Sequence, residues 1–341
     1  MAKENRNYAL DFLKFFFTVL IVLHHSGLLS QYLLRGYVAV ELFFFISGYL
    51  MCTSFQKGLS LKEFTKKRLL RLYPPYLIVF LFVLAALAVT GRRSYESWYA
   101  PLLEAVLLQN VGIPKSGAIN YPLWYLSVLF YGGTLLYAAK RALKKRWFNA
   151  IGILIVLLTY GYLAYTRGGV ESWRTVFGVI YLPFWRGVSA LLIGMWFREL
   201  PKPSLKVANL LQPVGFFAAI LLMVLPNVSD FAAVLALAVL VYGSTEPNTV
   251  FHRLGQIGVL RACYPYQYHA YLVHAPAIVI ARSAVGFIES RLAFRLPVVL
   301  DVALLLFVVA FSAVLIKSIT DVLFRFFERL IKNRKRSEPK N

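Results

Sequence analysis

The fold is decided near the start of the chain by the run Tyr8-Ala-Leu-Asp-Phe-Leu-Lys-Phe-Phe-Phe-Thr-Val-Leu-Ile-Val-Leu-His-His-Ser-Gly27. A helix that crosses the ~30 Å hydrocarbon layer of a bilayer needs about 20 mainly apolar residues, and this run has that length. It contains no small-residue cleavage site, so we expect it to stay in the protein as a membrane-spanning helix.

The composition of the whole chain agrees with this first run. Of the 341 residues, 59% are hydrophobic and 15% are charged, whereas soluble domains have about 45–50% apolar and ~25% charged residues. The mean hydropathy is +0.65. These values exclude a soluble enzyme, a disordered chain and a secreted disulfide scaffold, and the continuous apolar runs disfavour a β-barrel, whose strands alternate.

We therefore predict an all-α integral membrane protein with about ten transmembrane helices. The expected spans are residues 8–27, 36–55, 75–90, 121–139, 147–165, 175–197, 209–225, 230–244, 266–287 and 297–316. The more polar stretch 95–112 is predicted to be an interfacial or re-entrant helix. A single domain is expected over residues 1–331, followed by a basic, disordered cytoplasmic tail over residues 332–341.

The formal net charge is +22, from 37 Lys and Arg against 15 Asp and Glu. In a soluble protein this excess would indicate nucleic-acid binding. Here the basic residues lie between apolar runs, with a roughly threefold excess in the loops that share a side with the N-terminus. The pattern predicts that both termini are cytoplasmic, in a multi-pass protein of the plasma membrane, with no nucleic-acid partner.

Ionisable residues within the spans are expensive to bury and therefore informative. In the first span, Asp11, Lys14, Thr18 and His25 share one helical face, because Lys14 and His25 are within about 20° of each other at 100° per residue. One interpretation is an interfacial Asp11–Lys14 ion pair, with His25 at the headgroups. The other is that His25 is a neutral imidazole that acts as a general base.

Glu41 lies within an apolar run of the second span, at the depth expected for His25. A buried carboxylate needs a partner, so we expect a Glu41–His25 pair that orients the ring. The alternative is that Glu41 is a purely structural hydrogen-bond anchor. Arg186 and Asp301, also in spans, are interpreted as members of structural pairs without a chemical role.

Two further clusters carry polar groups. Arg68 and Arg71 share a helical face that is expected to end at Pro74, and paired guanidinium groups suit phosphate oxygens. The same residues also fit a positive stop on the cytoplasmic side. Near the other end of the chain, Tyr271 and His274 share a face of the ninth expected span.

In this order the motifs resemble those of the acyltransferase-3 family of membrane acyltransferases, over about residues 6–330. The matching blocks are Asp11-Phe-Leu-Lys14 with His25, Gly36 followed by Glu41-Leu-Phe-Phe-Phe-Ile-Ser-Gly-Tyr-Leu, Arg68-Leu-Leu-Arg71-Leu-Tyr-Pro74, Leu123-Trp124-Tyr-Leu and Tyr271-Leu-Val-His274. Lys14 stands where the family usually has arginine, and Glu41 where it usually has aspartate.

The resemblance implies transfer of an acyl group, commonly acetyl, from cytoplasmic acyl-CoA to a hydroxyl of an exported, cell-envelope or lipid-linked glycan. His25 would be the general base, Glu41 its partner, and Lys14 would hold the donor or the developing oxyanion. The residues expected to bind acyl-CoA, with acetyl-CoA as the favoured donor, are Arg68, Arg71, Tyr271 and His274.

One alternative from another class is a transporter or flippase of a lipid-linked sugar, which would also need many helices and buried charges. Another is a sensor domain that has kept the fold without the chemistry.

The expected partners are acyl-CoA, a glycan or lipid-linked saccharide, and membrane lipid. No metal site is predicted, because neither Cys52 nor Cys263 has ligand spacing. The sequence is compatible with a homo-oligomer and with a separate partner protein.

Overall fold

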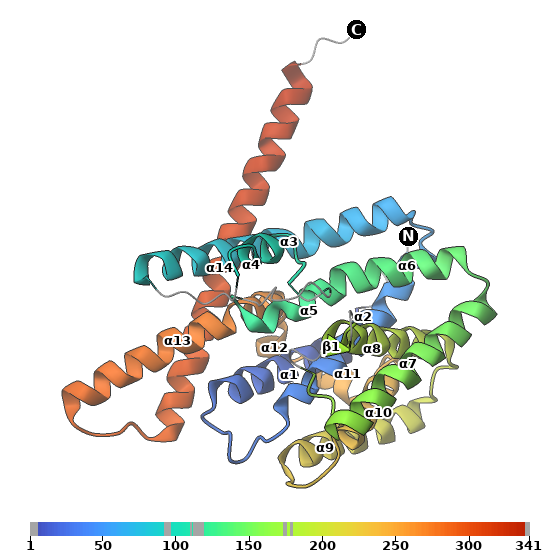
Figure 1. The fold of residues 1–341 in the computed structure, drawn as a ribbon, viewed down its shortest axis with the longest axis horizontal. Helices are drawn as coiled ribbons and strands as arrows, with labels where there is room; N and C mark the ends of the chain where they lie inside the picture. Colours follow the sequence, from blue (N-terminus) through green and yellow to red (C-terminus); the bar gives the residue numbers. More distant parts are fainter. Residues whose placement is uncertain are drawn as a thin grey trace.

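The computed structural model describes residues 6–91, 97–109, 111, 119–172, 176–177 and 180–337. They form an all-α bundle apart from one short hairpin (Figure 1). The α-helices are α1 Tyr8–Ser26, α2 Ala39–Gln56, α3 Leu61–Thr90, α4 Ala100–Ala105, α5 Trp124–Ser127, α6 Gly133–Ala142, α7 Lys145–Arg167, α8 Leu182–Glu199, α9 Leu205–Val224, α10 Asp230–Gly243, α11 Val250–Gly255, α12 Gly258–Cys263, α13 Gln267–Leu292 and α14 Val298–Ser337.

Short elements join these helices. The 3₁₀ turns are η1 Gly36–Val38, η2 Tyr121–Leu123 and η4 Tyr264–Tyr266, and η3 Val128–Gly132 is a π-helical segment between α5 and α6. The strands β1 Val176–Phe177 and β2 Ile180–Tyr181 pair antiparallel. The predicted all-α class is therefore confirmed.

Seven helical segments among the described residues are long and apolar enough to cross a membrane. They are Tyr8–Ser26, Gly36–Gln56, Leu61–Thr90, Lys145–Arg167, Leu205–Val224, Gly258–Leu292 and Val298–Phe326. The three other predicted spans coincide with the run from η2 to α6, with α8, which carries three charged residues, and with α10, which has 14 residues. The number ten therefore stays a prediction.

Helix α2 packs most extensively against α8, and also against α10 and α1. Two glycines allow the close approach of α2 and α8. A Cβ at Gly48 would collide with the carbonyl of Leu191, and one at Gly194 with the carbonyl of Phe45. Small residues at such crossings let helix backbones approach closely, which is how helices pack without a hydrophobic drive in lipid.

Helix α3 differs from the expectation. Ser60 and Glu63 form a capping box that starts the helix within the predicted basic loop, and the helix continues through Pro74 and Pro75 to Thr90. Proline removes a backbone donor, but membrane proteins tolerate it where neighbouring groups satisfy the backbone. Pro74 and Pro75 remove the amide donors for the carbonyls of Leu70 and Arg71. In the adjoining turn, the hydroxyl of Tyr268 donates to the carbonyl of Leu72 at 2.7 Å.

Helices α13 and α14 form a hairpin, which the ion pair between Arg282 and Asp301 braces at 2.6 Å. Helix α14 then continues to Ser337, well beyond the expected end at residue 316, and its final turns project from the bundle (Figure 1). The backbone of residues 332–337 is thus helical where we expected disorder. Residues 338–341 lie outside the described part of the chain.

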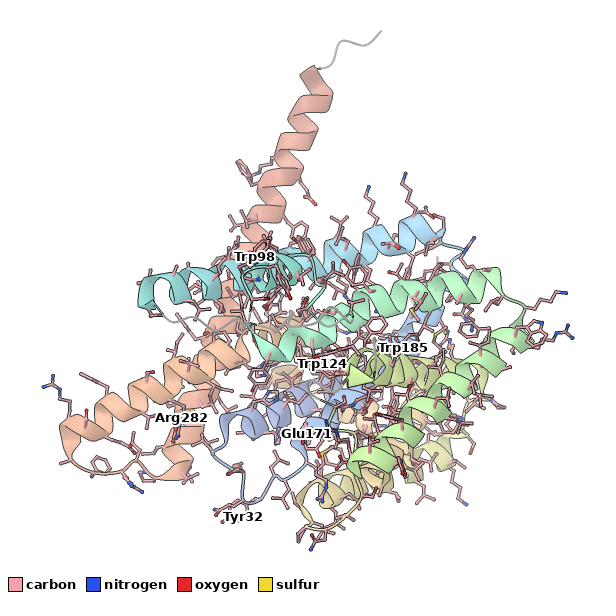
Figure 2. The ribbon with its side chains drawn as sticks, viewed as in Figure 1. Tyr32, Trp98, Trp124, Glu171, Trp185 and Arg282 are labelled. Atoms are coloured by element: carbon pink, nitrogen blue, oxygen red, sulfur yellow. The ribbon has the colours of Figure 1, made fainter. Side chains whose placement is uncertain are left out.

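Within the predicted interfacial stretch 95–112, the structure contains α4, a helix of six residues. Glu104 of this helix is fully buried, whereas Trp98, just before the helix, is 79% exposed. Trp98 is labelled in Figure 2. Residues 95, 96, 110 and 112 of that stretch lie outside the described residues. This one-sided burial agrees with a helix that lies against the bundle.

Candidate functional site

Two histidines meet between the end of α1 and the start of α13. Nδ1 of His25 lies 2.8 Å from Nε2 of His274, and the two rings are inclined by only 10° with their centroids 5.0 Å apart. His274 is fully buried and His25 is half-buried. The hydrogen bond therefore joins residues 249 positions apart in the sequence.

The backbone fixes the direction of this hydrogen bond. Nδ1 of His274 lies 2.6 Å from the carbonyl oxygen of Tyr271. Because a carbonyl oxygen only accepts, Nδ1 of His274 carries the proton and, in the neutral ring, Nε2 is an acceptor. Nδ1 of His25 must then donate, which leaves the lone pair of His25 on Nε2. This is the tautomer that a general base requires.

Residues 119–122 form a loop that also packs against His25. The ring of Tyr121 contacts the imidazole edge to face, with centroids 5.2 Å apart. The Tyr271 hydroxyl donates to the carbonyl of Pro122 at 2.5 Å, and the side-chain amide of Asn120 donates to the carbonyl of Leu272 at 3.2 Å. The loop is thus attached to the same helix that holds His274.

Glu104 anchors this loop from α4. Its carboxylate accepts the backbone amide of Ile119 at 2.6 Å and that of Asn120 at 3.2 Å. Burial raises the pKa of Glu104 to about 7, although both backbone hydrogen bonds oppose that rise. Sequence reasoning missed this residue. The available signal was a lone carboxylate within the apolar run 101–108.

The expected pair between Glu41 and His25 is not formed. The carboxylate of Glu41, fully buried, accepts from Nε of Arg186 at 2.5 Å and from the hydroxyl of Tyr160 at 3.3 Å. Arg186 comes from α8, the helix packed against α2 at Gly48, and it supplies the opposite charge that a buried carboxylate needs. Arg186 is thus a member of a buried ion pair, as expected, and its partner is Glu41, which pairs with Arg186 and not with His25.

The polar face of α1 divides into two parts. Lys14 forms an ion pair with Asp11 at 2.7 Å, and Asp11 also binds Arg6 at 2.5 Å. The hydroxyl of Thr18 donates to the carbonyl of Lys14. His25 lies about 16 Å further along the helix, at 1.5 Å per residue. Lys14 is therefore too far along α1 to contact a group that reacts at His25.

Asp11, Lys14 and Thr18 instead line a cavity of about 890 Å³ between α1, α2, α3, α13 and α14. Such a volume falls within the range of ligand pockets. We call it the arginine cavity, because Arg68 and Arg71 of α3 also line it. Its two acidic residues are already paired, Asp11 as above and Asp321 with Lys317, so the cavity has a surplus of positive charge.

Arg68 holds an unsatisfied donor in this cavity. Its Nε is buried and has no hydrogen-bond partner in the described part of the chain. Its guanidinium lies over the ring of Phe64, with Cζ 5.4 Å from the ring centroid. A Cβ at Gly133 would be 2.8 Å from Cζ of Arg68, so the glycine that follows the π-helical segment makes room for the guanidinium. Arg71 is exposed.

Tyr271 belongs to both parts of the site. Its side chain lines the arginine cavity, while its carbonyl binds His274. Its ring packs with that of Tyr125, with centroids 5.3 Å apart, and Tyr125 also lines the cavity. Of the four residues expected to bind the donor, Arg68, Arg71 and Tyr271 are brought together around the cavity. His274 is not among the cavity residues and contacts His25.

These elements define a multi-pass membrane protein with an internal basic cavity and a histidine pair beyond it. The acyltransferase-3 family model, described as an acyltransferase domain, matches residues 7–317. The chain belongs to this family and is a membrane acyltransferase. Searches of curated proteins and of solved structures found no match.

Proposed function

We propose that this protein transfers an acyl group, acetyl in the favoured case, from acyl-CoA to a hydroxyl of an exported, cell-envelope or lipid-linked glycan. The observation that carries the proposal is the hydrogen bond from His25 to His274, which leaves Nε2 of His25 free as a base. His274 acts as a positioning residue, because it reaches the reacting atoms only through His25.

The reaction needs only one base. Nε2 of His25 takes the proton of the acceptor hydroxyl while its oxygen attacks the thioester carbonyl carbon. The new C–O bond forms and the C–S bond breaks, so that CoA leaves as a thiolate. The imidazolium of His25 then returns the proton to this thiolate. No group on the protein is acylated in this scheme.

The arginine cavity is the proposed donor site. The Arg68 and Arg71 guanidinium groups suit the phosphates of CoA, since planar forks bind phosphate oxygens bidentately. We assign Lys14 to donor binding as well, and not to oxyanion stabilisation, because it lines this cavity about 16 Å from His25 along α1. The thioester arm would extend from the cavity past Tyr271 towards His25.

The distribution of basic residues supports the orientation. With both termini in the cytoplasm of a plasma-membrane protein, the arginine cavity faces the cytoplasmic pool of acyl-CoA. His25, at the other end of α1, then faces the opposite side, where exported or lipid-linked glycans are found.

The test compares wild-type protein with the His25→Gln variant in membrane vesicles supplied with radiolabelled acetyl-CoA. We expect incorporation of acetyl into the glycan fraction to fall by about 10²- to 10⁴-fold, the usual contribution of a general base. The matched control is His252→Gln, which changes a histidine of α11 that contacts Gln256. This variant should retain full acetyl transfer. If the His25→Gln variant and the wild type transfer acetyl equally, His25 is not the general base.

A further inference from the structure

A second, smaller pocket lies at the end of α1 opposite to the arginine cavity. It has a volume of about 490 Å³ and is bordered by the segment before α2, the end of α7 and the start of α10. The residues that matter are Arg35, Tyr37, Arg167, Gly169, Glu171 and Asp230. We call it the Asp230 pocket. Its volume is suited to a small ligand.

Asp230 organises this pocket. One carboxylate oxygen lies 3.1 Å from Nε of Arg35, and the other accepts from the Tyr37 hydroxyl and from the backbone amide of Val170, each at 2.8 Å. Asp230 is buried. The segments before α2 and after α7 are therefore held to α10 through one carboxylate, and the pocket wall is preformed.

Gly169 leaves the space in which this carboxylate sits. A Cβ at Gly169 would collide with an oxygen of Asp230. Arg35 is further fixed because it donates to the carbonyl of Leu225 at 2.5 Å. Glu171 and Arg167 are exposed at the pocket mouth. In Figure 2, Tyr32 lies at the outer tip of the loop after α1, and Glu171 lies nearer to the body of the bundle.

The pocket adjoins the histidine pair through His24. The ring of His24 lies between those of His25 and Tyr37, with centroid separations of 5.5 Å and 5.7 Å. His24 also packs directly on Gly36, where a Cβ would be only 2.5 Å from its Cβ, and its Nδ1 bonds to the carbonyl of Leu33. A ligand held by Tyr37 is thus one side chain away from His25.

We propose that the Asp230 pocket binds a sugar unit of the glycan acceptor, an assignment that rests on the proposed function. Each hydroxyl of a sugar both donates and accepts hydrogen bonds. The pocket is lined by two guanidinium groups, two carboxylates and a phenol, a set with balanced charge. Because Asp230 already neutralises Arg35, a phosphate would gain little there, in contrast to the arginine cavity.

The test measures sugar binding directly, without acyl transfer. The purified full-length protein is titrated with p-nitrophenyl glycosides of glucose, galactose and N-acetylglucosamine, and dissociation constants are obtained from saturation-transfer NMR. Tyr37→Phe removes the phenol hydroxyl from the pocket, and Glu171→Ala removes the carboxylate at its mouth. We expect each to weaken binding by about three- to tenfold.

The matched control is Tyr32→Phe. Tyr32 lies between α1 and α2, as Tyr37 does, but it is 62% exposed and outside the pocket. It should bind the glycosides as the wild type does. Three results would overturn the proposal: unchanged glycoside binding in both pocket variants, no glycoside binding to the wild type, or equal weakening of binding by Tyr32→Phe. So would displacement of the glycosides by inorganic phosphate.

The two proposals fail separately. If the wild type binds glycosides in a Tyr37-dependent way but transfers no acetyl from acetyl-CoA, the sugar pocket stands and the acyl-transfer proposal does not. If acetyl transfer depends on His25 but Tyr37→Phe does not change glycoside binding, the acyl-transfer proposal stands and the acceptor sugar binds outside the Asp230 pocket.

Discussion

Nδ1 of His25 donates a hydrogen bond to Nε2 of His274 across 2.8 Å, and the carbonyl of Tyr271 holds the far nitrogen of His274 in place. The His25 ring, the proposed base, is therefore oriented by a second imidazole and not by a carboxylate. A neutral partner fixes the tautomer of His25 without placing a negative charge in the interior, where an unpaired charge is costly.

This arrangement predicts the behaviour of His274→Leu, whose side chain has no hydrogen-bond acceptor. Without the acceptor at Nε2, the His25 ring loses its fixed tautomer, so kcat for acetyl transfer should fall by about 10²-fold. The dissociation constant for acetyl-CoA should stay at the wild-type value, because His274 lies outside the arginine cavity. A weaker affinity for acetyl-CoA with an unchanged kcat would instead make His274 a donor-binding residue.

The ion pair of Glu41 and Arg186 predicts a stability effect. Glu41→Gln leaves the guanidinium of Arg186 buried without its counter-charge, which should cost about 3–5 kcal/mol of folding free energy. Thermal unfolding in detergent measures the loss. The double variant Glu41→Gln/Arg186→Gln should be more stable than the sum of the two single variants predicts. A Glu41→Gln protein of wild-type stability that transfers no acetyl would argue for a catalytic carboxylate.

The cavity around Arg68 predicts the effect of a single methyl group. In Gly133→Ala the new Cβ would be 2.8 Å from Cζ of Arg68 and would displace the guanidinium. Affinity for acetyl-CoA should fall by about tenfold, which corresponds to one charge-assisted hydrogen bond. Calorimetric titration with acetyl-CoA measures it. Gly161→Ala on α7 is the control, since nothing lies within 4 Å of its Cβ. Equal affinities in both variants would contradict the role of Arg68.

Glu104 predicts a dependence of stability on pH. Burial raises the pKa of Glu104 from its ordinary 4.5 to about 7, so the folded protein holds a proton that the unfolded chain releases between these values. The contribution of Glu104 to stability is fully present below pH 4.5 and is lost as the pH rises to about 7. Glu104→Gln stays neutral, so its melting temperature should decrease less between pH 5 and 8.

The control for Glu104→Gln is Glu246→Gln, a change at a glutamate in the loop after α10 that should keep the wild-type pH dependence. The measurement is the melting temperature of the wild type and of both variants at pH 5 and at pH 8. If Glu104→Gln and wild type show the same decrease, the carboxyl group does not titrate in this window.

Much of the fold follows from the sequence, because apolar runs of span length have few alternatives in a bilayer. Each of the ten predicted spans overlaps helical residues, and the pairing of Asp301 with Arg282 fits its structural interpretation. The predicted end at Pro74 was wrong. A rule derived for water treats proline as a helix end, whereas α3 continues through it with Tyr268 donating to the adjoining turn.

The candidate site was harder to predict than the fold. Helical periodicity placed Lys14 and His25 on one face of α1, but it could not say which helix each residue meets. The depth of Glu41 in its span suggested His25 as a partner, yet α8 brings Arg186 to it. Likewise, the spacing of Tyr271 and His274 predicted that they share a helical face. It could not predict that Tyr271 lines the cavity while His274 forms a hydrogen bond with His25.

Helix α14 has a practical consequence for imaging. At 1.5 Å per residue its 40 residues make a rod of about 60 Å, twice the ~30 Å of the lipid hydrocarbon. A compact protein fused in helical register at Ser337 would be carried as a rigid fiducial outside the detergent belt. Particle alignment, which is difficult for a 38.7 kDa membrane protein, could then rely on that marker.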